Sequence, residues 1–163
     1  MFLRYFVVVP RPYADVEHAL ASGTENWLPD LALLADGHAM KLLSDLGVSV
    51  ASHRFAKKIQ VEVSEPRHFT GATLLSLRWQ SASASGLFPT LDGQLEIAPI
   101  GPASTQLGLS GSYEPPLGAL GRVADRALMH RVAELTVKDF LDRIGERLAH
   151  TAAAVPDAVS TVA

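Results

Sequence analysis

Hydrophobic and polar residues alternate with a period of two in several stretches between residues 59 and 113. This period is typical of β-strands that have one buried face and one face in water. Turn residues separate the stretches at hairpin distances, which predicts an antiparallel meander. The predicted strands centre on residues 59–63, 75–80, 94–97 and 106–113, with the last turn at Pro99 to Pro102, and residues 40–54 are expected to add one more.

The residues before this meander predict a strand and two short helices. Phe2 to Val9 is rich in β-branched and aromatic residues and ends at Pro10, as expected of a strand. Tyr13 to Ala21 follows as a short helix with a proline just before it and Gly23 after it. Asn26 to Ala35 is the second predicted helix, with Pro29 in its first turn.

Residues 117–150 contain no proline and are rich in good helix formers, so they predict a helix roughly 50 Å long. Its apolar residues form two faces more than 90° apart, so we expect the helix to bend or change packing partner near residues 132–137. Alternatively, the first face covers a cavity or a partner chain while the second packs on the core. Residues 151–163 show no pattern and are predicted to be a disordered tail. The first face comprises Leu120, Ala124, Ala127, Leu128 and Leu135, and the second Val137, Phe140, Leu141, Ile144 and Leu148.

Composition limits the classes of function. The 163 residues are 48% hydrophobic and 19% charged, which predicts one globular domain over residues 1–150. The net charge of −3 has both signs interspersed, so no nucleic-acid partner is expected. Cysteine is absent and the six histidines lack ligand spacing, so we expect no cofactor and no metal. The apolar run Tyr5 to Val9 is too short for membrane insertion, and a cytoplasmic location is expected.

The order of strand, two short helices, antiparallel strands and a long C-terminal helix resembles the helix-grip fold of the START-like (SRPBCC) superfamily. That superfamily includes birch-pollen allergen relatives, lipid-transfer domains and polyketide cyclases. The most specific part, Gly86 to Glu134, is similar to the last two strands and the C-terminal helix of uncharacterised actinobacterial members. The resemblance implies an α+β fold in which a curved antiparallel sheet of six or seven strands wraps around the long helix. It also implies an apolar cavity between the sheet and the helix.

The phase of the alternation predicts which side chains face that cavity. Trp79 and Tyr113 fall in the inward phase, whereas Arg78 and Glu96 fall in the outward phase. Trp27 is expected in the core. Small residues, including Gly93, Gly108, Gly111, Ala124 and Ala127, are expected to leave space inside, although they could equally serve the twist of a tightly packed sheet. The predicted ligand-binding residues are Leu77, Trp79, Leu95, Ile97, Leu109, Tyr113, Ala127 and Leu128.

Three functions remain open at this point. The first is a binding protein or carrier for a small apolar molecule, such as a lipid, an isoprenoid or a polyketide-like compound, without catalytic residues. The second is an enzyme of the polyketide cyclase or aromatase type, for which Tyr113 is the single polar candidate in the inward phase. The third is a non-catalytic interaction module that forms a homodimer through the displaced face of the long helix.

Overall fold

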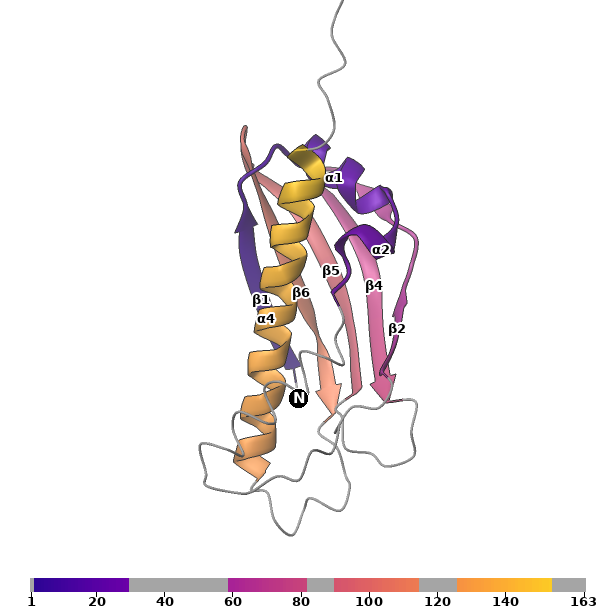
Figure 1. The fold of residues 1–163 in the computed structure, drawn as a ribbon, viewed down its shortest axis with the longest axis vertical. Coiled ribbons are helices and arrows are strands. Elements are labelled where there is room, and N and C mark those ends of the chain that lie inside the picture. The colour runs from indigo at the N-terminus through magenta and orange to yellow at the C-terminus, as the bar shows by residue number, and fades with distance from the viewer. Residues whose placement is uncertain (1, 30–58, 82–89, 115–125, 154–163) are drawn as a thin grey trace, which may run out of the picture.

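The computed structural model describes residues 2–29, 59–81, 90–114 and 126–153. These residues form a six-stranded antiparallel sheet with one long helix, α4, packed along it (Figure 1). The sheet has the order β1-β6-β5-β4-β2, and β3 pairs with β4 beside β2. Its strands are β1 (Phe2–Val9), β2 (Ile59–Val63), β3 (Arg67–Phe69), β4 (Ala72–Ser81), β5 (Thr90–Gly101) and β6 (Ser104–Glu114). The helices are α1 (Tyr13–Ala21), α2 (Thr24–Trp27) and α4 (Arg126–Ala153).

Most of the predicted elements are confirmed, and β1 and α1 have the predicted bounds. The strand β3 was missed because its hairpin to β4 depends on a two-residue turn, Thr70-Gly71, in which Gly71 has a φ of 81°. The last turn was placed too early. β5 continues to Gly101, with a register shift between Pro99 and Gly101, because a proline without an N–H interrupts the ladder locally without ending the strand.

The second short helix is wrong in its position. α2 covers only Thr24–Trp27, and Leu28 is extended with a ψ of 120°. The residue before a proline is disfavoured in the helical conformation, so Pro29 ends this helix and does not begin it. The remainder of the helix predicted to Ala35, and the strand predicted at residues 40–54, lie outside the described residues.

α4 is one unbroken helix through residues 132–137, and all five residues of the second predicted face are buried. Of the first face, only the side chain of Leu135 lies within the described part of the chain. Leu135, assigned to the first face, is 39% exposed. The helix also runs three residues past His150, because Thr151 to Ala153 continue it and Ala152 lies buried one turn after Leu148. The tail prediction is therefore wrong for these three residues, and residues 154–163 lie outside the described part of the chain. The buried face is formed by Val137, Phe140, Leu141, Ile144 and Leu148.

The short helices close one end of the sheet (Figure 1). Trp27 is fully buried, as predicted, and its Nε1 donates to the carbonyl of Leu20 at 3.0 Å. Arg147 of α4 donates to the carbonyl of Leu28 at 2.6 Å, and Arg11 donates to the carbonyl of Ala149 at 3.2 Å. These long-range bonds fix the last turns of α4 against the N-terminal segment.

Candidate functional site

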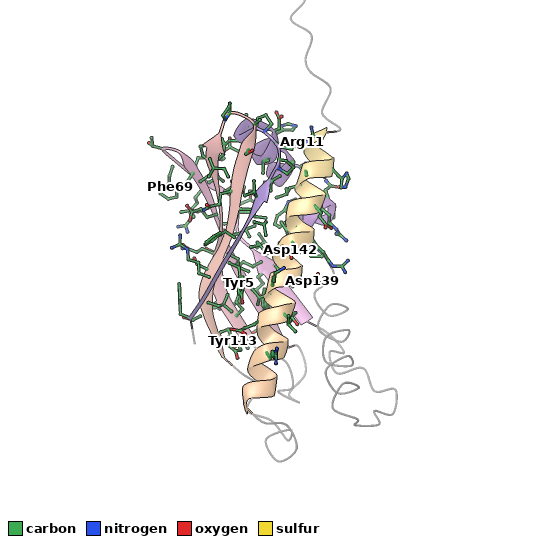
Figure 2. The ribbon with its side chains drawn as sticks, turned by 90° about the vertical axis from the view of Figure 1, so that its left-hand side faces the viewer. Tyr5, Arg11, Phe69, Tyr113, Asp139 and Asp142 are labelled. Atoms are coloured by element: carbon green, nitrogen blue, oxygen red, sulfur yellow. The ribbon has the colours of Figure 1, made fainter. Side chains whose placement is uncertain are left out.

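The concave face of the sheet meets α4 (Figure 2) and is mostly apolar, with two buried threonines, Thr73 and Thr105, at one end. One row joins Val61, Trp79, Leu91 and Tyr113 on four neighbouring strands, and the next but one joins Leu75, Leu95 and Leu109. Six of the eight predicted ligand-binding residues therefore lie buried on this face, as their phase predicted. These six are Leu77, Trp79, Leu95, Ile97, Leu109 and Tyr113. The other two, Ala127 and Leu128, belong to the first turn of α4, and their side chains are outside the described part.

The convex face carries the predicted outward residues. Arg78 is exposed and forms an ion pair with Asp92, its direct neighbour across β4 and β5. Glu96 has Gly108 opposite it on β6, also away from the core. The register of the sheet is thus the one that the alternation predicted, and no charged side chain of these two strands points inward.

Trp79 is the most informative residue of the concave face. Its ring meets the ring of Phe140 edge-on, with centroids 5.4 Å apart and an interplanar angle of 77°. The side chain is 1% exposed, and its Nε1 is the one buried side-chain nitrogen of the described residues that has no hydrogen-bond partner. An unpaired buried donor costs about 1–3 kcal/mol. The other buried tryptophan, Trp27, donates its indole N–H to the carbonyl of Leu20. The unpaired indole N–H is therefore a property of position 79.

The glycines of the sheet hold the strands close together. Gly93 and Gly111 face each other across β5 and β6, and a Cβ on Gly111 would lie 2.6 Å from both the Asp92 carbonyl oxygen and the Gly93 Cα. These two positions therefore support the alternative of a tightly coiled sheet. Gly108 was expected to leave space inside, which is wrong, because it pairs with the outward Phe6 and Glu96.

A polar cluster joins α1 to the strands β3 and β4. Glu17 Oε1 accepts from Thr73 Oγ1 at 2.5 Å and from the Tyr13 hydroxyl at 2.9 Å, and it lies 2.9 Å from His68 Nδ1. The bond from Thr73, followed by those from Tyr13 and His68, holds the pKa of Glu17 below its ordinary value despite partial burial. Burial, the largest cause, raises the pKa of Tyr13. The sequence analysis did not find this cluster, whose members lie as far as 60 residues apart.

Within the described residues, no group of three metal-ligating side chains comes together. Thr73 is buried, and its hydroxyl also lies 2.7 Å from the Tyr13 hydroxyl, so the cluster is bonded within itself. This arrangement supports a structural role: the cluster fastens α1 to the sheet.

Replacing Glu17 with glutamine should lower the free energy of unfolding at neutral pH by about 1.5–3 kcal/mol, the scale of hydrogen bonds to a charged group. A carboxyl group with a lowered folded-state pKa stabilises the fold above its unfolded pKa, and this stability is lost as the pH falls through the folded pKa. The difference between wild type and Glu17→Gln should therefore shrink toward acid pH. Denaturant titrations at several pH values measure it. The exposed Glu65→Gln serves as the control, and an equal, pH-independent loss in both variants would contradict the role given to Glu17.

Comparison with known proteins identifies the fold. A conserved protein from Geobacillus kaustophilus is 17% identical with a TM-score of 0.51, over 93% of this chain and 97% of that one. A hypothetical protein from Helicobacter pylori is 10% identical with a TM-score of 0.53, over 93% and 88%. A START superfamily protein from Mycobacterium smegmatis is 14% identical with a TM-score of 0.39, over 89% and 97%. No protein-family model and no curated protein matches the chain. The element order gives the chain a helix-grip fold, as predicted, and the first two similarities, with TM-scores above 0.5, show that those two proteins share this fold.

None of the helices in the described ranges has the length and apolar content that a membrane span requires.

Proposed function

We propose that this protein reversibly binds a small apolar molecule that carries one hydrogen-bond acceptor, such as a carbonyl oxygen. The observation that carries this proposal is the buried, unpaired Nε1 of Trp79 on a mostly apolar face. Apolar surface binds a ligand by burial, at about 25 cal/mol per Å², and a few polar groups orient it. A ligand with an acceptor would satisfy the indole N–H that the folded chain leaves unpaired. Lipids, isoprenoids and polyketide-like compounds that carry an acceptor oxygen belong to this chemical class.

The inward side chains favour binding over catalysis. General acid–base catalysis needs a titratable group positioned beside the reacting atoms. The buried polar side chains of the described residues that are not aromatic are Thr73, Thr105 and Thr136. Thr73 is engaged with Glu17, and Thr105 donates to the carbonyl of Arg11 at 2.9 Å. The cyclase alternative therefore depends on Tyr113, and the binding alternative has the stronger support.

The test uses two matched probes, a long-chain ketone and the alkane of the same length, with protein labelled with ¹⁵N at the indole nitrogens. The chain has two tryptophans, so Trp27→Phe assigns the two indole signals. We expect the ketone to shift the Trp79 signal downfield and to leave the Trp27 signal in place, because the Trp27 N–H already has its acceptor.

Trp79→Phe should then weaken ketone binding about fivefold, the scale of one hydrogen bond, and change alkane binding less. Trp27→Phe is the control for the loss of a buried indole. If neither probe binds the wild-type protein, the proposal fails. If both bind equally and the Trp79 signal does not move, the interior binds apolar molecules but Trp79 does not select them.

A further inference from the structure

Among the strands that the structure describes, none covers the outer edge of β1. Among the described strands, β1 pairs with β6 alone, over all eight residues from Phe2 to Val9 and without a register shift. An edge strand exposes N–H and carbonyl groups that can pair with another strand, and proteins usually block such edges with lysine, proline or a bulge. β1 has none of these and carries a single charge, Arg4.

The convex side of the same strand is apolar and open to solvent. Phe2, Phe6 and Val8 are 68%, 62% and 61% exposed, and they lie in one line because alternate residues of a strand share a face. Opposite them on β6 stand Ser112, Gly108 and Gln106, which give these side chains little cover. An exposed apolar row on a free edge favours further pairing.

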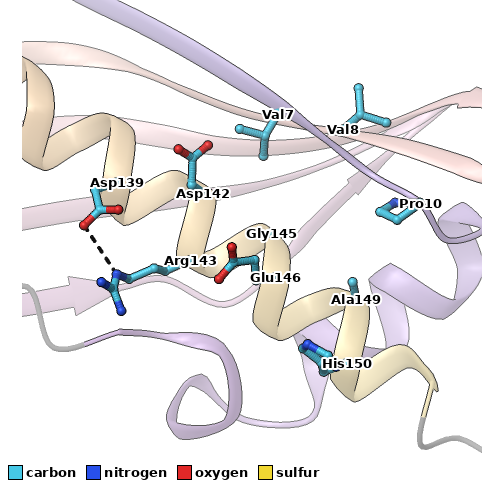
Figure 3. Close-up of a pocket in the computed structure, with 10 residues that line it drawn as sticks. All are labelled: Val7, Val8, Pro10, Asp139, Asp142, Arg143, Gly145, Glu146, Ala149 and His150. Carbon is cyan, nitrogen blue, oxygen red and sulfur yellow. Dashed lines mark hydrogen bonds and ion pairs between the residues drawn. The ribbon is translucent and has the colours of Figure 1, made fainter.

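Open space lies beside this edge. A groove of about 570 Å³ separates β1 from α4, and both Val7 and Val8 line it (Figure 3). Because consecutive side chains point to opposite faces, a groove that both of them line lies at the edge of the strand. Helix and strand lie close together at Gly145, where a Cβ would lie 3.1 Å from a methyl group of Val7.

The helix side of the groove carries three carboxylates, those of Asp139, Asp142 and Glu146. Its carboxylates Asp139 and Asp142 are already paired within α4, with Arg143 at 3.4 Å and with Lys138 at 2.7 Å (Figure 3 shows the first pair). A single exposed carboxylate, Glu146, does not make a cation site, whereas the strand edge offers a whole row of backbone donors and acceptors.

We propose that a second copy of this chain pairs with that edge, β1 against β1, so that the two sheets become one. Residues directly opposite each other in an antiparallel pair lie on the same face, so even-numbered residues must meet even-numbered ones. The register centred on Tyr5 meets this condition. It places Phe2 opposite Val8 of the second copy and Phe6 opposite Arg4, so each exposed apolar side chain gains a neighbour. An arginine over a phenylalanine ring adds a cation–π contact, and the two-fold axis repeats every pair. This surface differs from the helix face considered in the sequence analysis, and the pairing does not depend on the proposed ligand.

Light scattering coupled to size-exclusion chromatography, over a range of protein concentrations, tests the pairing. The wild-type protein should show twice the mass of one chain. In Phe6→Lys, the new lysine of each copy lies opposite Arg4 of the other copy. This repulsion should weaken dimerisation about tenfold. Phe69→Lys is the matched control, because Phe69 is 56% exposed on β3 at the other side of the sheet, and this variant should stay dimeric.

A charge exchange tests the register. Adding Arg4→Glu to Phe6→Lys gives two opposite-charge pairs in the register centred on Tyr5 and should restore the dimer. Hydrogen exchange of the β1 amides in the wild-type protein gives a second readout that needs no variant, with protection that falls on dilution. A wild-type protein that is monomeric at every concentration would overturn the proposal, and pairing of β1 with an extended segment of another protein would then be the alternative. Equal weakening in Phe6→Lys and Phe69→Lys, or no recovery in the double variant, would overturn it as well.

Discussion

Replacing Phe140 with alanine should lower the free energy of unfolding by about 3–5 kcal/mol, the usual cost of removing a buried phenylalanine. Phe140 is fully buried on the face of α4 that packs on the sheet, and its ring contacts the ring of Trp79 edge-on. Its removal would leave a cavity between the helix and β4 that the surrounding strands can fill only in part. The denaturant midpoint, with an unchanged slope, measures the loss.

Leu135→Ala is the matched control on the same helix. Leu135 is partly exposed, so its truncation should cost less than about 1 kcal/mol. A similar loss in both variants would mean that the two faces of α4 contribute equally, which contradicts the packing described above. The Trp79 indole signal should also move in Phe140→Ala, because the Phe140 ring contacts it edge-on, and stay in place in Leu135→Ala, whose side chain is exposed.

The behaviour of α4 shows what periodicity can predict. The face from Val137 to Leu148 followed from a rotation of 100° per residue, and all five of its residues are buried. Leu135 precedes Phe140 by five positions, so the two side chains point about 140° apart on an ideal helix. A single straight helix that packs on one sheet buries one such face along its length. The sequence contained both faces but did not show that Leu135 would lie off the sheet, and the other side chains of the first face lie outside the described part of the chain.

Two other errors in the predicted fold arose at single residues, Pro29 and Gly71, whose backbone preferences end a helix or form a turn. Pro29 ended a helix that the pattern of apolar residues continued, because the residue before a proline avoids the helical conformation. β3 has only three residues and no buried side chain, so it has no alternation to detect. Its existence depends on the positive φ of Gly71, a property of the turn and not of the strand.

The sequence predicted the part of the candidate site that depends on neighbouring residues, and it missed the part that depends on contacts between distant ones. The inward phase of Trp79 and Tyr113 followed from alternation, which needs only neighbouring residues. The unpaired Nε1 of Trp79 could not be predicted, because it depends on which groups from other strands and from α4 surround the ring. Likewise, Glu17 meets Thr73 across 56 residues of sequence, and this contact exists only once α1 lies over the end of β4.

Gly111→Ala should destabilise the protein by about 1–3 kcal/mol, the cost of overpacking a well-packed interior. The new methyl group would lie 2.6 Å from two backbone atoms of β5, and a backbone, unlike the end of a flexible side chain, has to move as a whole strand. Gly111 lies beside Leu3 on β1 as well as beside Gly93 on β5, so the strain would reach both neighbouring strands.

Gly101→Ala provides the control for this prediction, because a Cβ at Gly101 would meet no atom within 4 Å and its φ is not positive. That variant should be unchanged or slightly more stable, since alanine has fewer unfolded conformations to lose. Thermal unfolding of the two variants side by side separates a requirement for close approach from a general effect of removing glycine. Equal stability of both variants would mean that β5 and β6 can separate freely. In that case the close approach at Gly111 would not be what curves the sheet around Trp79, Leu91 and Tyr113. Packing against α4 would then have to cause the curvature.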